Sequence, residues 1–285
     1  MKKNILIISL SIVLLLILNF KENNMNTDEN MSYNSQLNIR YGDHPEQIMD
    51  LYIPKDKFNI KKDVFIIVHG GGWNKDDKKE LTAFTLELTK KFPNHIFANI
   101  NYRLATSSRF GFPNQTEDID TALKYLKNTL QYQPEFVILG NSAGSNISML
   151  YSYKYDTQKK IKAVINIVGP SNLSDPEFKK YEDYAFVEKA LVDPKLLADN
   201  ESATDFASPI KWINKNSPPT FSFYGTKDHI IPLSQKDFLE AALKKHNIMS
   251  EFYTFEGGHT DWEYGSHAPF LINKISDFLK RLNLK

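Results

Sequence analysis

Short apolar runs and amphipathic stretches alternate along most of this chain. From residue 37 on, eight runs have the β-branched and aromatic composition of strands. The run VFIIVHG is continuously apolar at its start, as expected of a strand that is covered on both faces of a parallel sheet. The expected strands cover residues 37–42, 48–54, 64–70, 95–104, 135–140, 162–169, 220–225 and 251–258.

Helical periodicity fills most of the intervals between these strands. In residues 116–130, apolar positions recur at helical spacing, with acidic residues in the first turn and Lys in the last. Similar patterns occupy residues 80–92, 143–155, 234–246 and 269–282. The alternation predicts an α/β fold, with a mostly parallel central sheet and helices on both faces. Residues 171–219 contain five prolines and break the alternation, which predicts a short, charged, cap-like excursion over the sheet.

The N-terminal residues differ from everything that follows. The stretch from Ile5 to Leu18 carries no charge and follows the basic head MKKN, a pattern typical of a signal peptide. No Ala-x-Ala site follows, so an uncleaved membrane anchor is the alternative within residues 1–24. Residues 25–36 are polar without periodicity, which predicts a linker, and residues 37–285 form the expected domain. We therefore expect an exported protein that is secreted, periplasmic or membrane-anchored.

Composition excludes several functional classes. The chain has 285 residues, of which 41% are hydrophobic and 24% charged, as in globular proteins. Its net charge of +1 gives no reason to expect a nucleic-acid partner. The absence of cysteine excludes disulfides, thiolate metal sites and a cysteine nucleophile. No pattern calls for a cofactor or a metal.

Two glycines flank Ser142 at the end of an expected strand. The sequence Gly140-Asn-Ser142-Ala-Gly144 follows FVIL and opens an expected helix. This context turns a weak G-x-S-x-G match into a nucleophile elbow, because side chains on either glycine would obstruct a tight strand-to-helix turn. The pattern predicts Ser142 as a catalytic nucleophile.

A run of three glycines follows another strand, in the sequence HGGGW at residues 69–73. Glycines leave backbone N–H groups exposed, which a developing oxyanion requires and an ordinary turn does not. The first residue of the run, His69, is expected to hold the glycine loop rather than to transfer protons.

A serine nucleophile needs a base, and the base needs an acid to orient it. His259, in EGGHTDW after the last expected strand, is the favoured base, and His267 is the alternative. Asp228 lies just beyond the strand TFSFYG and is the favoured acid, since Asp261 is too close in sequence to His259. The resulting order of Ser, Asp and His along the chain is that of an α/β-hydrolase.

At these motifs the chain resembles esterases of the α/β-hydrolase superfamily. It is most similar to the carbohydrate-esterase and feruloyl-esterase-like branch (BD-FAE-like) and to the hormone-sensitive-lipase-like group. The resemblance covers QIMDLYIP, HGGGW, NYRL, FPNQTEDIDTALKYL, GNSAGS, SPI, YGTKDHIIP and GGHTDW. It implies a triad of Ser142, Asp228 and His259. It also implies an oxyanion hole formed by the N–H groups of Gly71, Gly72 and Ala143.

The chain departs from the family pattern at two positions beside the nucleophile. Asn141 stands where relatives often carry an acidic residue, and Ser145 stands where glycine is usual. Neither side chain is expected to contact substrate, so we expect altered loop packing rather than lost activity.

The expected reaction is hydrolysis of a carboxylic ester through an acyl-enzyme. The excursion lacks a long apolar segment, which favours short acyl groups such as acetyl, or an aromatic acyl group such as feruloyl, on a small molecule or a polysaccharide. Trp73, Tyr102 and Trp262 are candidates for lining the substrate pocket, with a place in the core as the alternative. A peptidase or amidase of the same fold and an inert binding module are the competing functions.

Overall fold

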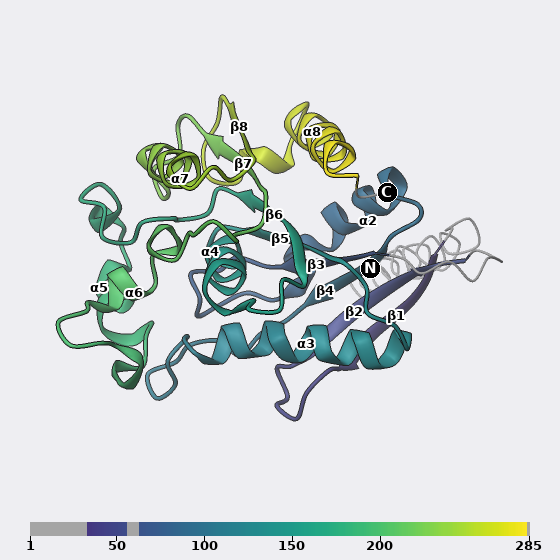
Figure 1. The fold of residues 1–285 in the computed structure, drawn as a ribbon, viewed down its shortest axis with the longest axis horizontal. Helices are drawn as coiled ribbons and strands as arrows, with labels where there is room; N and C mark the ends of the chain where they lie inside the picture. The colour runs from purple at the N-terminus through teal and green to yellow at the C-terminus, as the bar shows by residue number, and fades with distance from the viewer. Residues whose placement is uncertain (1–32, 56–62, 284–285) are drawn as a thin grey trace, which may run out of the picture.

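The computed structural model describes residues 33–55 and 63–283. Within these residues the chain forms an eight-stranded sheet with the strand order β1-β2-β4-β3-β5-β6-β7-β8 (Figure 1). The two pairings of β2, with β1 and with β4, are antiparallel, and all other pairings are parallel. The strands are β1 Tyr33–Arg40, β2 Ile48–Pro54, β3 Val64–Val68, β4 Ile96–Ile100, β5 Phe136–Asn141, β6 Ile161–Ile167, β7 Thr220–Gly225 and β8 Ser250–Phe255. The predicted α/β fold with a mostly parallel sheet is confirmed.

Helices cover both faces of this sheet. The central strands contribute alternate side chains to two apolar clusters, one on each face. In β3, Val64, Ile66 and Val68 pack into one apolar cluster, whereas Phe65 and Ile67 pack into the other. The first cluster includes residues of α3, α4 and α7, and the second includes residues of α2 and α8 (Figure 1). Strands buried on both faces explain the continuous apolar runs in the sequence. The long helices are α2 Thr82–Lys91, α3 Asn114–Leu130, α4 Ala143–Leu150, α7 Ser234–Lys245 and α8 His267–Arg281.

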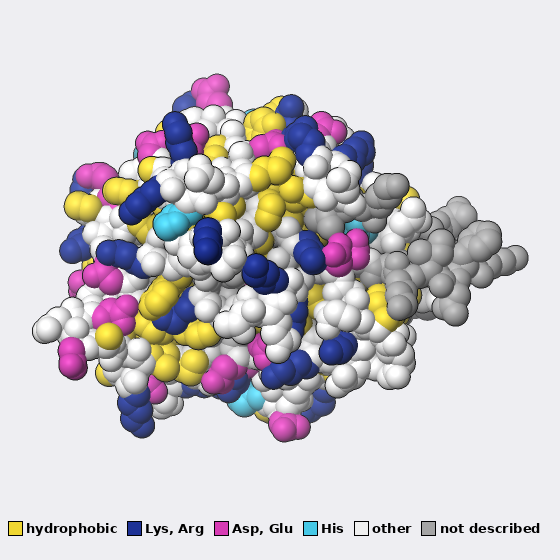
Figure 2. All heavy atoms as spheres, viewed as in Figure 1, with side chains coloured by type: hydrophobic (Ala, Val, Ile, Leu, Met, Phe, Trp, Pro, Cys, Tyr) yellow, Lys and Arg dark blue, Asp and Glu magenta, His cyan; other side chains and the backbone are white. Residues whose placement is uncertain are grey.

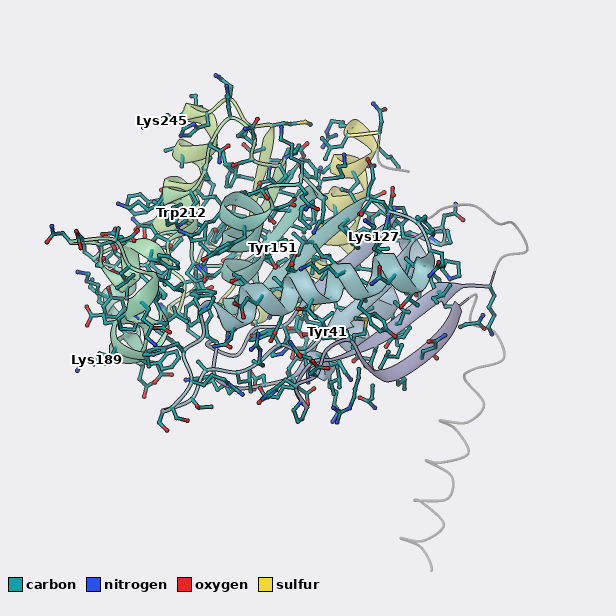
Figure 3. All side chains as sticks on the ribbon, turned by 60° about the horizontal axis from the view of Figure 1, so that its bottom comes forward. Tyr41, Lys127, Tyr151, Lys189, Trp212 and Lys245 are labelled. Carbon is teal, nitrogen blue, oxygen red and sulfur yellow. The ribbon has the colours of Figure 1, made fainter. Side chains whose placement is uncertain are left out.

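The excursion between β6 and β7 forms short helical turns at one end of the molecule. They are η3 Phe178–Lys180, α5 Tyr184–Ala190, η4 Pro194–Leu196, α6 Ala203–Phe206 and η5 Pro209–Lys211. Lys154, in the π-helical turn η2 Tyr151–Tyr155 that continues α4, joins this excursion to the main domain. Its Nζ atom lies 2.8 Å from the ring centroid of Trp212 and 4.1 Å from that of Phe206. Figure 3 labels Trp212 on the excursion side of the molecule. Cation–π attraction therefore helps to hold the excursion in place.

The N-terminal boundary of the domain differs from the expectation. Strand β1 begins at Tyr33, within the stretch predicted to be a linker, because the Tyr33 hydroxyl donates a hydrogen bond to Phe92 O at 2.7 Å and its ring packs against Phe97. The predicted leader at residues 1–24 lies outside the described residues and stays a prediction. Within residues 33–55 and 63–283, no helix combines the length and the apolar character needed to span a bilayer.

The described surface carries charges of both signs. Figure 2 shows Lys and Arg interspersed with Asp and Glu on the face in view, without a field of one sign. This mixture of charges on the face in view is in keeping with the net charge of +1.

Candidate active site

Ser142 occupies a sharp turn between β5 and α4. Its backbone has φ 51° and ψ −125°, a conformation that residues with a side chain rarely adopt. A Cβ atom at Gly140 would lie 2.4 Å from the carbonyl carbon of Gly144, and one at Gly144 would lie 2.2 Å from Val68 O. Glycine is therefore required on both sides of Ser142, as the sequence pattern predicted.

The three residues expected to form a triad lie in one hydrogen-bonded chain. His259, after β8, has its Nε2 atom 2.9 Å from Ser142 Oγ and its Nδ1 atom 2.8 Å from Asp228 Oδ2. The other carboxylate oxygen of Asp228, Oδ1, accepts the backbone N–H groups of Ile230 and Ile231 at 2.8 Å each. The Asp228 side chain is fully buried and the His259 side chain is 15% exposed. This arrangement fixes the tautomer of His259, with Nδ1–H donating to the carboxylate and Nε2 facing the serine.

The alternative base and acid lie elsewhere. His267 begins α8, where its ring centroid lies 5.1 Å from that of Phe255. Asp261 accepts the backbone N–H of Gly258 at 2.7 Å, so its carboxylate shapes the turn that carries His259 instead of contacting the imidazole. The structure thus places His259 and Asp228 in one hydrogen-bonded chain with Ser142. The alternatives, His267 and Asp261, are not part of this chain.

The glycine loop after β3 lies directly beside Ser142. A Cβ atom at Gly70 would lie 3.2 Å from Ser142 Cβ. Gly71 and Gly72 have φ values of 91° and 56°, and a Cβ atom at Gly71 would lie 2.1 Å from Lys75 O. Among the described residues, the N–H groups of Gly71 and Gly72 have no backbone acceptor outside the regular helices and strands. Ala143 N is the first amide of α4, where helical N–H groups lack intrahelical acceptors.

His69 and Tyr102 support this loop from behind. The Tyr102 hydroxyl lies 3.0 Å from His69 O and 2.9 Å from Gly70 O, and the two rings stack at a centroid distance of 4.3 Å. Burial lowers the pKa of His69 to about 4. The imidazole is therefore neutral near pH 7, and Nδ1–H donates to Gly70 O at 2.9 Å. The structure agrees with the expectation that His69 holds the loop.

The structure places the three aromatic residues that are candidates for lining the substrate pocket in the core, the alternative that the sequence left open. Trp73, Tyr102 and Trp262 are 2%, 1% and 1% exposed. Trp73 Nε1 donates to Asn146 Oδ1 at 3.1 Å, and the Trp262 ring packs edge-on against Phe84. Trp73 is bonded to the loop 101–113 and to α4, and Trp262 packs against α2. A position after a strand at this edge of the sheet therefore does not by itself turn a side chain toward substrate.

Two amides that the sequence analysis did not single out connect the site to its surroundings. Asn146 receives the Trp73 indole N–H, and its own Nδ2 group donates to Pro170 O at 3.1 Å and to Ala207 O at 3.0 Å. Gln115 Nε2 donates to Trp73 O at 2.7 Å. Asn146 could have been recognised from the sequence, because it is an amide one helical turn after Ser142 on a helix whose other residues are apolar or small.

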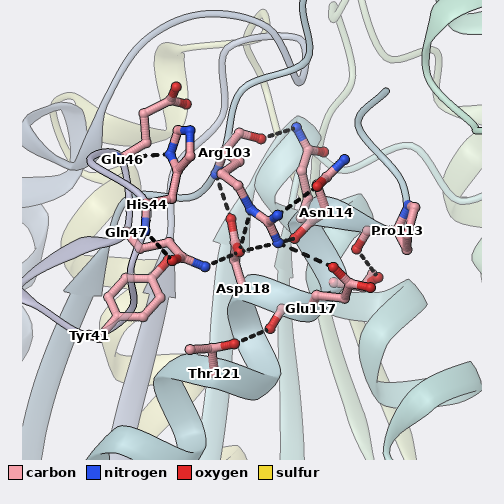
Figure 4. Close-up of polar contacts among 12 residues, drawn as sticks. Tyr41, His44, Glu46, Gln47, Arg103, Pro113, Asn114, Glu117, Asp118 and Thr121 are labelled. Atoms are coloured by element: carbon pink, nitrogen blue, oxygen red, sulfur yellow. Dashed lines mark hydrogen bonds and ion pairs between the residues drawn. The ribbon is translucent and has the colours of Figure 1, made fainter. Parts of the chain in front are cut away.

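The loop that carries Tyr102 is anchored by a buried carboxylate, shown in Figure 4. Asp118, on α3, is fully buried and accepts the backbone N–H of Arg103 at 2.7 Å and its Nε–H at 2.8 Å. Gln47 Nε2 donates to the same carboxylate at 2.6 Å. The segments NYRL (residues 101–104) and TEDID (residues 116–120) therefore contribute the two sides of this anchoring contact, Arg103 and Asp118.

The two departures from the family pattern have different surroundings. The Ser145 hydroxyl donates to Gly140 O and accepts Ile167 N–H at 3.0 Å, so it joins the ends of β5 and β6. A Cβ atom at Gly169 would lie 2.2 Å from Ser145 Cβ. Serine, which is larger than the glycine usual at position 145, therefore fits because residue 169 opposite it is a glycine. The Oδ1 atom of Asn141 is buried without a hydrogen-bond partner. Nothing in the structure explains why the family's acidic residue is replaced there.

Within the part of the chain that the structure describes, one cleft lies away from the predicted site residues. A cleft of about 720 Å³ lies between α3 and η2 and includes none of the predicted site residues. Among the described residues, no three His, Asp or Glu side chains are grouped so as to hold a metal ion.

Comparisons with known proteins give a consistent picture. The BD-FAE family model matches residues 49–243, a range that includes Ser142 and Asp228 and ends before His259. Esterase LipC of Mycobacterium tuberculosis is 26% identical over 221 residues, which are 71% of this chain and 53% of the relative. The probable isoprenylcysteine alpha-carbonyl methylesterase ICMEL1 of Oryza sativa subsp. japonica is 25% identical over 250 residues, or 78% and 56% of the two chains. The chain thus spans about half the length of these curated relatives.

Solved structures share the fold at lower sequence identity. A truncated carbohydrate esterase from gut microbiota has a TM-score of 0.70 and 19% identity, covering 90% of this chain and 99% of that chain. Carboxyl esterase 2 from the fungus Tuber melanosporum also has a TM-score of 0.70 and 19% identity, covering 90% and 89%. Both likenesses show the same overall fold.

Proposed function

The chain belongs to the BD-FAE family, and from this membership we propose that it is a serine carboxylic ester hydrolase. The observation that carries the proposal is the hydrogen-bonded chain from Asp228 through His259 to Ser142, with contacts of 2.8 and 2.9 Å. A nucleophile, a base and an orienting acid in this geometry are suited to acyl transfer.

In the proposed reaction, Ser142 Oγ attacks the ester carbonyl carbon while His259 Nε2 takes its proton. The electron pair of the C=O bond moves to oxygen, and the oxyanion accepts hydrogen bonds from the N–H groups of Gly71, Gly72 and Ala143. Collapse breaks the ester C–O bond, and His259 gives its proton to the departing alcohol. Water then attacks the acyl-enzyme, its proton passing through His259 to Ser142 Oγ as the carboxylic acid leaves. Asp228 stays ionised and stabilises the imidazolium in both steps.

We propose a short acyl or an aromatic acyl ester as substrate, on a small molecule or a polysaccharide. The excursion supports the short-acyl assignment, because α5 and α6 have 7 and 4 residues and supply no long apolar lid. Relatives named as esterases and methylesterases also favour esters over amides. An inert binding module is disfavoured, because the catalytic groups stand in hydrogen-bonded contact.

The first prediction tests the nucleophile. A fluorophosphonate probe should label Ser142, and Ser142→Ala should lower kcat for p-nitrophenyl acetate by about 10⁴-fold or more. His259→Ala should have a comparable effect. His267→Ala is the matched control and should retain activity, because His267 lies outside the hydrogen-bonded chain. Labelling at another residue, or full activity of Ser142→Ala, would show that the assignment is wrong.

The competing amidase function is tested with the same variants. Hydrolysis of an aminoacyl anilide that exceeds hydrolysis of the acetate ester, and that depends on Ser142, would replace the esterase proposal by the amidase.

A further inference from the structure

The excursion places one side chain over the glycine loop. A Cβ atom built on Gly72 would lie 3.2 Å from the hydroxyl oxygen of Tyr181. Tyr181 directly follows η3, whereas Gly72 follows β3, so two segments distant in sequence meet at this point. Since Gly72 N–H is a proposed oxyanion donor, the Tyr181 hydroxyl lies at the edge of the proposed reaction centre.

The ring of Tyr181 is held in a fixed position. It stacks on Phe178 with a centroid distance of 5.6 Å and an interplanar angle of 14°, and Phe178 is only 1% exposed. The backbone N–H of Tyr181 donates to Phe178 O at 2.9 Å, and that of Tyr184 donates to Tyr181 O at 3.0 Å. A rigid aromatic side chain that carries a polar atom can bind a ligand at little cost in conformational entropy.

The hydroxyl of Tyr181 retains unused hydrogen-bonding capacity. Its hydrogen bond to Asp183 Oδ2 is 3.4 Å long, near the upper limit for such a contact. A phenol donates one hydrogen bond and accepts others, and burial raises the pKa of Tyr181 to about 12, so the group stays protonated near neutral pH. The hydroxyl is therefore available to a polar group of the substrate.

Other polar side chains surround the same point. The Cβ position on Gly72 lies 3.7 Å from Asn74 Oδ1 and 4.0 Å from Lys75 Cε. The side chains near Gly72 thus offer an amide, an ammonium group and a phenol. Such surroundings favour a hydroxylated ligand over a bare hydrocarbon, because apolar groups gain nothing by displacing water from polar partners.

We propose that Tyr181 is a specificity-determining residue whose hydroxyl hydrogen-bonds a hydroxyl group of the substrate. The inference rests on the proposed esterase function and narrows its substrate to hydroxylated esters. That hydroxyl belongs either to a sugar-like alcohol or to a phenolic acyl group, and the same chemistry at Tyr181 serves both.

The test uses Tyr181→Phe, which removes only the hydroxyl, and two matched pairs of esters. A mono-O-acetylated methyl xylopyranoside is compared with its dideoxy analogue, in which hydrogen replaces the two free hydroxyl groups, and methyl ferulate with methyl 3-methoxycinnamate. Loss of one neutral hydrogen bond, about 0.5–1.5 kcal/mol, corresponds to about a 2- to 10-fold decrease in kcat/KM. We expect this decrease for the hydroxylated member of one pair and no change for its partner or for p-nitrophenyl acetate. The pair that responds identifies the source of the hydroxyl.

Tyr125→Phe, on α3, removes a phenol hydroxyl away from the site and should change none of these rates. An equal decrease in kcat/KM of Tyr181→Phe on every ester would assign Tyr181 a structural role. An unchanged kcat/KM on every ester would show that its hydroxyl does not determine specificity. Either result overturns the inference. Wild-type protein that hydrolyses p-nitrophenyl acetate through Ser142 but neither hydroxylated ester overturns the inference alone. Wild-type protein without any Ser142-dependent ester hydrolysis overturns the proposed function as well.

Discussion

At the scale of single residues, the site depends on side chains whose environment changes their chemistry. His69 is an example, because its Nε2 atom is buried without a hydrogen-bond partner and its ring is stacked on Tyr102. A proton on this ring would be desolvated, which is why burial lowers the pKa of His69 to about 4. The glycine loop is thus built on a neutral histidine.

This environment predicts a loss of stability in acid. Between pH 6.5 and about 4 the unfolded chain binds a proton at His69 and the folded chain does not, so the free energy of unfolding falls as the pH falls and levels off below about 4. From pH 7 to pH 5 this one group should remove about 2 kcal/mol. Urea unfolding at both pH values should show a smaller decrease for His69→Asn than for the wild type. The exposed His229→Asn is the control, and equal decreases in all three proteins would contradict the prediction.

At the scale of elements, a series of hydrogen bonds positions the glycine loop. It begins on α3 and passes through the loop 101–113. Asp118 on α3 holds Arg103, the neighbouring Tyr102 holds the backbone of His69 and Gly70, and Gln115 holds Trp73. Most of these partners are buried, so the helix α3 transmits its position to the loop through hydrogen bonds rather than through apolar packing alone.

Asp118→Ala should therefore damage both the fold and the reaction. Removing the carboxylate leaves the Arg103 guanidinium, 19% exposed, without its main partner, a change that typically costs about 3–5 kcal/mol. We expect a lower kcat as well, because Tyr102 and the glycine loop lose their anchor. Denaturant unfolding and ester hydrolysis measure the two effects. Glu87→Ala, which removes an exposed ion pair with Lys90, is the control and should stay within about 0.5 kcal/mol. A cost for Asp118→Ala below about 1 kcal/mol would contradict the role of the anchor.

The elements of this fold were predictable where local patterns determine them. The strands follow from apolar runs bounded by Gly and Pro, and the positions of Ser142, Asp228 and His259 follow from the rule that ligands gather beyond the carboxyl ends of parallel strands. The acidic residues predicted for the first turn of the helix at residues 116–130 include Asp118, which the structure buries against Arg103. The contact of Tyr181 with the glycine loop was also unpredictable, because it depends on how the excursion folds back toward the loop after β3.

At the scale of the whole molecule, one sheet edge gathers the loops after β3, β5, β7 and β8, and the excursion after β6 lies over them. The excursion is built from short turns whose aromatic residues, such as Phe178 and Phe206, face the core. Near Gly72 the excursion contributes the hydroxyl of Tyr181. The excursion therefore places a hydrogen-bonding group beside the proposed reaction centre.

This architecture predicts the dependence of activity on acyl length. In a series of p-nitrophenyl esters, we expect kcat/KM to be highest for acetate to butyrate and to fall or stay level for longer chains. A long apolar pocket would instead add up to about 0.8 kcal/mol per buried CH₂ group, or about fourfold in kcat/KM. Ser142→Ala sets the background at each length, and concentrations are kept below those at which the longer esters form micelles. A Ser142-dependent kcat/KM that still rises beyond about eight carbons would show that the excursion forms an acyl-binding lid after all, because only a continuous apolar surface rewards each added carbon.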